Sequence, residues 1–384
     1  MFRKNVFILG AGFSAKAGAP VMSDFLEKAK RLRDDPRLEL PREDHKTFGN
    51  VFKRLAELRI AQAKMDINIE NIEHLFGLVD MDLAFDGASS GSTLRRDLIL
   101  LILRTLEKFI DSEKLDKPRI NFQMRDLNGK PYLKILAANY VQLFSAFASR
   151  LWIRDGRFNR DVQDAIITMN YDCLLDDCLL KMGVQPDYGL ENSELPVEFK
   201  RLTRMLPVLK LHGSANWFQC TEPCEGGIWI SADSPAKRLE YFYGQRRPSC
   251  NHQVEPVIVP PTWAKGGQST ILRPVWTRAL QALREAGRIF IIGYSLPRTD
   301  EFFKYLLALA LATNERLDKI IVVNPSKEAQ DTFANLFSSH FGSKLTPVQK
   351  EIEEYIHPLG NELGQYEHGF DEDLIRSSRV MVQV

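Results

Sequence analysis

The first residues of the chain place the strongest constraint on its fold. Residues 6–9 are four consecutive apolar side chains, and they run directly into Gly10, Gly12 and Ala15, a G-x-G-x-x-A spacing. A short apolar run that ends in glycines is typical of a buried parallel strand followed by a tight loop and a helix. Small residues there let the main chain approach a pyrophosphate at a helix N-terminus, although such turns also serve plain packing.

Similar short apolar runs recur in the second half of the chain, and helix-like segments separate most of them. The runs lie at residues 165–168, 208–211, 257–259, 288–292 and 319–323. We expect helices at residues 172–182, 271–285, 299–313 and 327–337. Strands that alternate with helices of this length predict an α/β protein with a Rossmann-like, doubly wound and mostly parallel sheet.

A long segment without strand-like runs interrupts this alternation. Between residues 26 and 154, charged residues alternate with apolar ones at helical spacing, and residues 132–152 have the pattern of one long helix. We therefore predict a discontinuous Rossmann-like domain, residues 1–25 and 155–384, with an inserted helical domain at residues 26–154. Residues 340–384 carry no clear pattern.

Composition limits the classes of partner. Lys and Arg number 51 against 50 Asp and Glu, a formal charge of +1, which gives no argument for nucleic-acid or membrane binding. An odd count of five cysteines favours a reducing compartment over a disulfide framework. No apolar run approaches the roughly 20 residues of a membrane span, and the N-terminus has no signal-peptide pattern. We expect a soluble cytoplasmic protein.

His212 follows one of the predicted strands directly, at the end where doubly wound sheets bind their ligands. Histidine titrates near neutrality and is the usual general base in enzymes. Asn170 and Asp172 occupy the corresponding place after the strand at residues 165–168. On local pattern alone, both could instead serve the start of the helix that follows, as a cap and as a first-turn acid.

Five segments resemble, in order, the motifs of the sirtuin (SIR2) family. They are G-A-G-F-S at residues 10–14 with Gly18 and Pro20 after it, T-M-N-Y-D at 168–172, L-H-G-S at 211–214, G-Y-S-L at 293–296 and V-N-P-S at 323–326.

Within that family, the chain is similar to the SIR2-like proteins of bacterial anti-phage defence. The similarity rests on N-Y-D at residues 170–172, H-G-S-A-N-W at 212–217, P-P-T at 260–262, G-Y-S-L-P-R-T-D at 293–300 and N-I-E at 71–73 in the long insertion. Deacylating members have a Phe-Gly-Glu segment near the place where this chain has Val259 and Pro260. Proline cannot donate to a strand ladder, so pairing with an added peptide strand is disfavoured there.

The resemblance implies an NAD glycohydrolase that converts NAD to nicotinamide and ADP-ribose as the NAD-depleting effector of a defence system. It implies catalytic roles for Asn170 and His212, and a contact of Asp172 with the nicotinamide amide. Asp300 is left out of this set as the start of a helix. The residues expected to contact NAD are Gly10, Ala11, Gly12, Phe13, Ser14, Pro20, Asn170, Asp172, His212, Gly293, Ser295 and Asn324.

A cysteine cluster lies where many sirtuins carry a four-cysteine zinc module. Here the residues are Cys220, Cys224, Cys250 and His252, within residues 218–255. They could form a tetrahedral zinc site, but the spacing departs from paired C-x2-C, and one residue between Cys250 and His252 is tight for chelation. The alternative is a module remnant with free thiols.

The sequence leaves three interpretations of the function open. Besides NAD hydrolysis, they are NAD-dependent protein deacylation and a sensor that binds NAD or ADP-ribose without turnover. The resemblance also implies a homo-oligomer and a partner protein of the ATPase or nuclease type from a defence operon.

Overall fold

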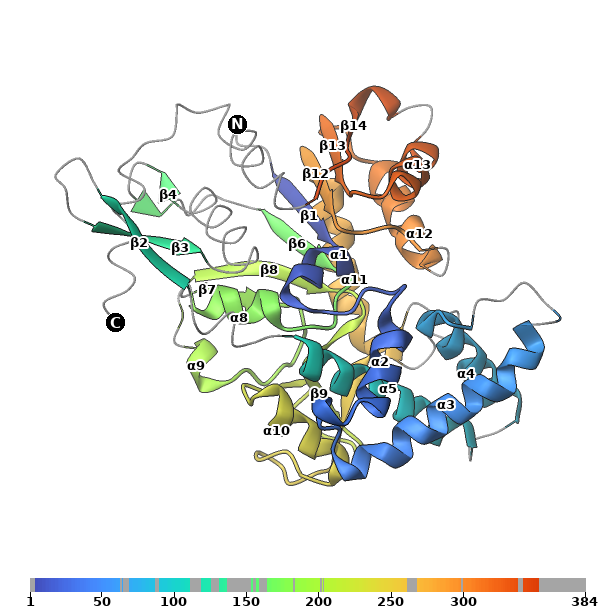
Figure 1. The fold of residues 1–384 in the computed structure, drawn as a ribbon. Coiled ribbons are helices and arrows are strands. Elements are labelled where there is room, and N and C mark those ends of the chain that lie inside the picture. The colour runs from blue at the N-terminus through green and yellow to red at the C-terminus, as the bar shows by residue number, and fades with distance from the viewer. Residues whose placement is uncertain are drawn as a thin grey trace.

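The computed structural model describes residues 4–62, 64, 69–86, 90–110, 119–125, 131–136, 153–154, 157–158, 164–181, 184–200, 202, 204–260, 268–297, 300–337 and 341–351. A seven-stranded sheet runs through the molecule in the order β14-β13-β12-β1-β6-β8-β7, and its strand pairs are parallel (Figure 1). If the edge strand β7 is left out and the other six strands are numbered in chain order, the sheet reads 3-2-1-4-5-6 from β8 to β14, which is the doubly wound Rossmann arrangement. The predicted fold class is therefore confirmed.

The central strands β1, β6, β12 and β13 consist mostly of apolar residues because both faces of the sheet are covered there, as is usual for parallel sheets. Residues of β1 and β12 are almost wholly buried, and the rings of Phe7 and Phe290 stack with their centroids 4.8 Å apart. The strands are β1 (Asn5–Leu9), β6 (Ala165–Thr168), β7 (Val184–Asp187), β8 (Arg204–Lys210), β12 (Arg288–Ile292), β13 (Lys319–Val323) and β14 (Leu345–Val348). The helices of this part are α1 (Ala11–Ser14), α8 (Leu174–Lys181), α9 (Val197–Lys200), α11 (Gln268–Arg284), α12 (Glu301–Leu311) and α13 (Lys327–Leu336).

A second group consists of helices that pack against one another beside the sheet (Figure 1). They are α2 (Phe25–Asp34), α3 (Arg42–Gln62), α4 (Ile72–Asp86) and α5 (Ser90–Phe109). Their apolar faces form a core of their own, in which Phe48, Leu75 and Leu98 are fully buried. Among the described helices, none combines the length and the apolar character needed to cross a membrane.

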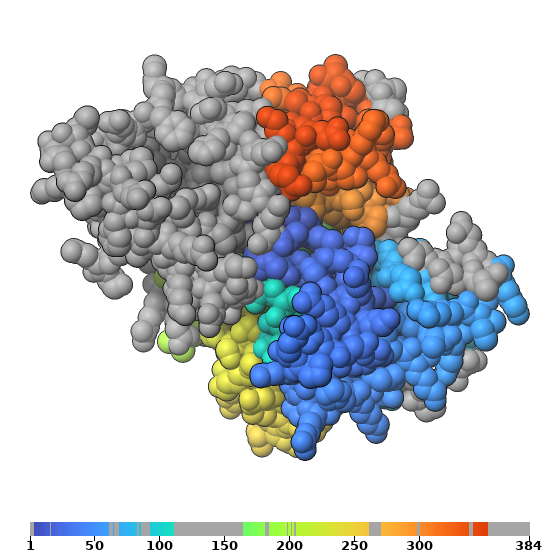
Figure 2. Space-filling view, viewed as in Figure 1, coloured from blue at the N-terminus to red at the C-terminus, as the bar shows by residue number. Residues whose placement is uncertain are grey.

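A small antiparallel sheet connects the two parts. It contains β9 (Gly213–Cys220), β10 (Trp229–Ile230) and β11 (Val254–Ile258), with α10 (Pro235–Glu240) and the 3-10 helix η3 (Tyr241–Tyr243) between the last two strands. Arg96 of α5 donates to the carbonyl of Phe242, and the hydroxyl of Tyr243 donates to Asp44 of α3. Figure 2 shows this segment, in yellow, directly beside the blue helices.

The structure corrects the prediction that residues 26–154 are helical throughout. Strand β2 (Arg119–Arg125) pairs antiparallel with β3 (Pro131–Leu136), and β4 (Ile153–Arg154) pairs with β5 (Arg157–Phe158). The long helix expected over residues 132–152 is thus wrong at its start, and residues 137–152 lie outside the described part. Ile120, Phe122 and Met124 alternate with polar residues, which is the period of a strand.

Two further differences concern strand placement. The first two residues of the run at 257–259 belong to β11, which pairs antiparallel with β9 and not with the main sheet. No helix was expected between it and the run at residues 208–211, whereas a parallel connection needs a crossover of a dozen or more residues, usually a helix. Strand β14 lies in a region that showed no pattern. The division into residues 1–25 with 155–384 and residues 26–154 stays a prediction.

The turns after β1 and β12 touch each other through their main chains. The N–H of Gly10 donates to Ile292 O at 3.0 Å, and the N–H of Gly12 donates to Gly293 O at 2.9 Å. Gly293 has φ +62°, and a Cβ there would lie 2.4 Å from the nitrogen of Phe13. Only glycine fits such a position, because it has both a left-handed backbone and no room for a side chain.

We expect Gly293→Ala to lower the free energy of unfolding by roughly 2–5 kcal/mol, since it adds backbone strain to a steric clash. The matched control is Gly244→Ala: Gly244 has φ +100°, but no atom lies within 4 Å of the position that a Cβ would take. That variant should lose about 1–2 kcal/mol from strain alone. Urea denaturation followed by circular dichroism measures both, and equal losses would contradict the close packing of the two turns.

Candidate functional site at the carboxyl edge of the sheet

The polar residues predicted from the sequence meet at the carboxyl ends of β1, β6 and β8. Thr168 lies level with Leu9 on one side and with Lys210 on the other. Asn170 and His212 each follow the last residue of their strand by two positions, so they leave neighbouring strands at the same edge. This is the edge at which doubly wound sheets bind ligands.

Asn170 joins the ends of β6 and β1. Its Nδ2 donates to Gly10 O at 3.0 Å and to Ser14 Oγ at 3.1 Å, and its own N–H donates to Thr168 Oγ1 at 3.1 Å. Ser14 is fully buried, and Asn170 is 9% exposed. The side chain therefore stands in a fixed orientation with one edge toward the turn after β1.

His212 is buried and oriented by the main chain of the residue after β11. Its Nδ1 lies 3.0 Å from Val259 O, and the N–H of Val259 donates back to His212 O at 2.8 Å. Because a carbonyl only accepts hydrogen bonds, Nδ1 carries a proton. Nε2 is consequently the nitrogen that accepts or releases a proton, and in the described structure it is buried without a hydrogen bond.

Asp300 faces that nitrogen, although sequence reasoning left it out of the site. Its Oδ2 lies 3.5 Å from His212 Nε2, and the side chain is 2% exposed. It occupies the position before α12, yet its side chain makes no capping hydrogen bond. The hydroxyl of Tyr294 donates to Asp300 Oδ2 instead. In the sequence, Asp300 is an acid a few residues after the turn that follows a predicted strand. An acid at this position is equally expected at the start of the next helix.

A cavity of about 70 Å³ opens between this edge of the sheet and the helices α2, α4 and α5. It brings Asn170 and Asp172 together with Glu73 of α4, which is 6% exposed. Burial raises the pKa of the Tyr171 hydroxyl well above its usual range, and the charges of Glu73 and Asp300 act in the same direction. The residues that line the cavity are Ala11, Ser14, Ala19, Pro20, Phe25, Ile72, Glu73, Phe76, Ile102, Leu106, Met169, Asn170, Tyr171, Asp172 and Pro260.

Asp172 is a buried acid in the same loop. Its Oδ1 accepts from the N–H of Leu174 at 3.1 Å, close to the start of α8. Burial raises the pKa of this carboxyl, while the nearby Lys210 ammonium and the Ser14 hydroxyl counteract part of the rise. A buried acid that lines a cavity beside a specific cation is the kind of group found at functional sites.

The remaining predicted residues support the turns and do not line the cavity. Phe13 is buried, and Gly10 and Gly12 use their N–H groups on the turn after β12. Asn324 donates through Nδ2 to Tyr294 O at 3.2 Å and accepts from Ser326 N at 3.0 Å. Ser295 is exposed in that turn, next to Leu296, which has an unusual φ of +55° for a leucine. Backbone strain of this kind occurs where the surroundings enforce it.

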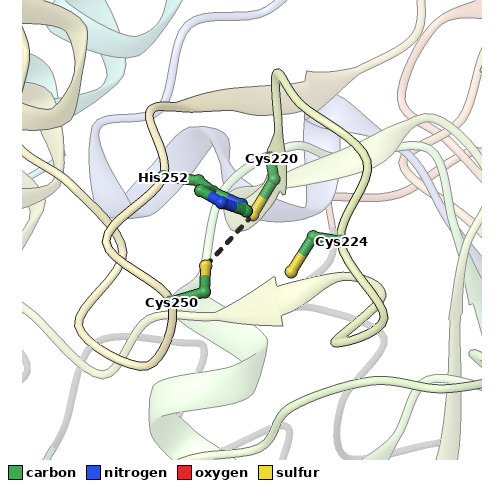
Figure 3. Close-up of side chains that lie close together, drawn as sticks. All are labelled: Cys220, Cys224, Cys250 and His252. Carbon is green, nitrogen blue, oxygen red and sulfur yellow. Dashed lines mark hydrogen bonds between the residues drawn. The ribbon is translucent and has the colours of Figure 1, made fainter.

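The predicted metal ligands converge at the far end of the small sheet (Figure 3). One ligand atom each from Cys220, Cys224, Cys250 and His252 lies within 4.8 Å of all the others, and the Cys220 and Cys250 sulfurs are 3.6 Å apart. Asn251 adopts φ +58°, which turns the chain so that both of its neighbours reach the cluster. The tight spacing is thus accommodated by a residue type that tolerates this conformation.

The donor set fits a zinc ion by two further observations. His252 Nδ1 is buried without a hydrogen bond in the described structure, as expected of an atom that serves as a metal ligand. Arg247 lies against the cluster, with Nη1 3.5 Å from Cys220 Sγ and 3.9 Å from Cys224 Sγ. The Gly226 N–H and neighbouring donors lower the pKa of Cys224 to about 7, whereas burial raises that of Cys220 to about 11.

Comparison with known proteins gives a family match for part of the chain. Residues 164–341 match the family model described as the SIR2-like domain, and this segment contains Asn170, His212, the cysteine cluster and Asp300. Among curated proteins, no sequence matches the chain significantly.

Several solved structures are similar at low identity. Sir2Tm bound to a propionylated peptide is 13% identical over 94% of both chains, with a TM-score of 0.41. A Sir2 homologue in complex with NAD is 15% identical, with a TM-score of 0.41, over 95% of this chain and 91% of that one. A Sir2 homologue mutant in complex with ADP-ribose is 14% identical over 96% of both chains, also at 0.41. At these TM-scores the similarities carry no argument about the site.

Proposed function

We propose that this chain is an NAD glycohydrolase that releases nicotinamide and leaves ADP-ribose. The observation that carries the proposal is the placement of Asn170 and His212 at the same edge of neighbouring strands, inside the segment that matches the SIR2-like domain. Asn170 and the buried acid Asp172 line a cavity. His212 does not line it, but its ring centroid lies 6.3 Å from that of Tyr171, which does. NAD is the substrate, and the Rossmann-like sheet is a fold that binds such dinucleotides at this edge.

The reaction breaks the bond between the nicotinamide nitrogen and the ribose carbon and forms a bond from that carbon to water. The overall balance is NAD⁺ plus water giving nicotinamide, ADP-ribose and one proton. The transition state resembles an oxocarbenium ion, so the site has to position water and accept its proton. His212 Nε2 accepts that proton because Nδ1 is held on Val259 O. The amide of Asn170 orients the water or the ribose, and Asp172 accepts from the nicotinamide amide.

Asp300 has a place in this scheme as the partner of the protonated histidine. When His212 accepts a proton on Nε2, the imidazolium forms 3.5 Å from a buried carboxylate. An opposite charge at that distance stabilises the charged form, all the more where water is excluded.

Deacylation is less well supported. It requires an acylated peptide to pair as an added strand beside β11. The N–H of Val259 is already bonded to His212 O, and Pro260 has no N–H to offer. The main chain at this position therefore lacks the free donors that a peptide strand uses.

The biological role that we propose is depletion of NAD in bacterial anti-phage defence. It rests on the resemblance of the motifs at residues 170–172, 212–217 and 293–300. We also propose cytoplasmic location, homo-oligomerisation and control by a partner of the ATPase or nuclease type on the same ground.

We further propose that the cysteine cluster binds one structural zinc ion through Cys220, Cys224, Cys250 and His252. Three thiolates and Zn²⁺ leave one net negative charge. The Arg247 guanidinium, whose side chain is fully buried and paired with Glu194, lies beside two of these sulfurs and offsets that charge. Structural zinc sites are closed four-coordinate sites, and this donor set provides four ligands.

The NAD glycohydrolase assignment predicts that purified protein releases nicotinamide from NAD, alone or with a candidate partner. His212→Ala should lower kcat by on the order of 10²–10⁴-fold, as loss of a positioned general base does. Asn170→Ala should lower kcat by about 10²-fold, because the water or the ribose is no longer oriented. His45→Ala, on the exposed surface of α3, is the matched control. Chromatography of the products measures the rate. Full activity in both site variants would refute the assignment, and turnover only with an acylated lysine peptide would favour a deacylase. Binding without product under all partner conditions would favour a sensor.

Asp300→Asn should reduce kcat by about 100-fold while leaving KM within a few-fold, because the carboxylate acts on the charged form of His212. Asp331→Asn, an exposed acid of α13, controls for general loss of negative charge. Steady-state kinetics at several pH values measures the effect. A wild-type kcat in Asp300→Asn would exclude a catalytic contribution from this acid.

Zinc binding predicts about one equivalent of metal per chain by elemental analysis. Cys250→Ser should lose it, whereas Cys178→Ser, a buried residue of α8 outside the cluster, should keep it. Removal of the ion by a chelator should expose Cys224 to iodoacetamide near pH 7, where a thiol with a pKa of about 7 is half ionised. Mass spectrometry locates the label. Equal labelling with and without zinc would argue for free thiols.

A further inference from the structure

Lys210 is an unusual residue for its position. It is the last residue of β8, and its side chain is 1% exposed. Lysine is almost never fully buried unless its charge is paired, because removing an ammonium from water costs several kcal/mol. The burial of this side chain two residues before His212 therefore needs a specific cause.

The ammonium group has one partner on the connection between β6 and α8 and a second partner in α8 itself. Nζ donates to Asp176 Oδ2 at 3.0 Å and to the main-chain carbonyl of Asp172 at 2.6 Å. Asp176 is itself 1% exposed, and its other oxygen accepts from the hydroxyl of Tyr188. The Tyr188 ring packs edge-on against Trp217, with centroids 5.0 Å apart. The lysine is thus anchored on one side and bound to a loop on the other.

That loop carries the groups that line the cavity. Asn170, Tyr171 and Asp172 all face it. The carbonyl of Tyr171 accepts from the N–H of Ala215 at 2.8 Å, and the next carbonyl, that of Asp172, accepts from Lys210. Successive carbonyls of the loop are therefore fixed by donors from β8 and the strand after it.

We propose that Lys210 is a positioning residue: its ammonium, anchored by Asp176, holds the main chain of residues 170–172 in the shape that presents Asn170 and Asp172 to the cavity. Lys210 does not touch the substrate in this assignment. It acts through the loop. The part of the proposal that concerns catalysis rests on the proposed NAD glycohydrolase function, whereas the part that concerns the loop does not.

The charges around Asp172 give the same lysine a second effect. Burial raises the pKa of Asp172, and Lys210 is the strongest influence in the opposite direction, followed by Ser14 and the Leu174 N–H. Asp176 of α8 raises it. From α10, Arg238 reaches the neighbouring Cys173 sulfur at 3.2 Å, and burial raises the pKa of that thiol to about 11, so it stays neutral.

A merely structural ion pair is the competing explanation, and a double variant separates the two. Lys210→Met alone leaves the Asp176 carboxylate buried without its cation, so it is expected to unfold more easily. Lys210→Met with Asp176→Asn removes both charges, and the asparagine can still accept from Tyr188. Replacing a buried pair by neutral groups is often neutral for stability. The double variant therefore keeps the fold and removes the ammonium that binds the loop, without leaving the Asp176 carboxylate buried and unpaired.

The first measurement is hydrogen–deuterium exchange of the full-length protein, followed by mass spectrometry. In the double variant, peptides covering residues 168–174 should exchange about tenfold faster, as expected for loss of a hydrogen bond to a charged group. Peptides of β13 should not change. Lys327→Met with Asp331→Asn, an exposed pair on α13 at 2.8 Å, is the matched control. Unchanged exchange in the loop of the folded double variant would overturn the proposal.

The second measurement is the pH profile of NAD hydrolysis. In the double variant, loss of Lys210 raises the pKa of Asp172 and loss of Asp176 lowers it. Lys210 is the stronger of these two influences, so the net change is a rise, and the ionised form of Asp172 is lost at a higher pH as the solution is acidified. The acid limb of kcat should shift upward in the double variant, and kcat should fall at least tenfold with the melting temperature close to that of the wild type. Recovery of both stability and kcat would show that the pair is only structural. If the wild type does not hydrolyse NAD, the proposed function fails, and the exchange experiment still decides the role of Lys210.

Discussion

The contact between the turns after β1 and β12 is the constraint around which the site is assembled. At this point the strand order reverses, and the N–H of Gly12 is bonded to Gly293 O. A side chain at either glycine would collide with the opposite main chain. The carbonyl of Gly10 accepts from Asn170, and the residue after Gly293 supplies the hydroxyl bound by Asp300. The close approach of these two backbones therefore positions groups that follow β1, β6 and β12.

The buried polar side chains at this edge of the sheet are held by contacts with one another and with the main chain. Asn170, Asp172, Lys210, His212 and Asp300 are all buried, and each costs free energy unless it is paired. Each of them contacts main chain or another buried polar group, so the conformation of one limits that of the next. Such networks are costly when incomplete and rigid when complete. A rigid first layer is what catalysis by positioning requires.

The central strands of the main sheet could be predicted from the sequence because they are continuous apolar runs. The runs at residues 165–168, 288–292 and 319–323 coincide with β6, β12 and β13. A short run of apolar residues without polar positions is typical of a strand that is buried on both faces of a parallel sheet. The edge strand β7 and the hairpin of β2 and β3 were not predicted, because short strands with a single apolar face resemble loops or helices in a single sequence.

Only part of the candidate site could be predicted from the sequence. Asn170 and His212 stand at strand ends, and a strand end is visible in the sequence. Asp300 was interpreted as a helix start, and Lys210 as an ordinary member of a strand. Their significance depends on partners that are distant in the chain, His212 for one and Asp176 for the other. Local pattern cannot supply a tertiary contact of this kind.

The segment between Cys224 and Cys250 has a consequence for the organisation of the whole chain. Leu239 and Phe242 lie in this segment, yet together with Ile258 of β11 they belong to the core of helices α2–α5. Apolar contacts between segments so distant in sequence raise the contact order of the structure, and a high contact order slows folding. Deletion of residues 26–154 would therefore expose the apolar side chains of Leu239, Phe242 and Ile258 to water. The helices α2–α5 lie between strands of the main sheet in the sequence, but their core includes side chains from the segment between Cys224 and Ile258. Insertion or deletion of these helices would therefore also require changes in that segment.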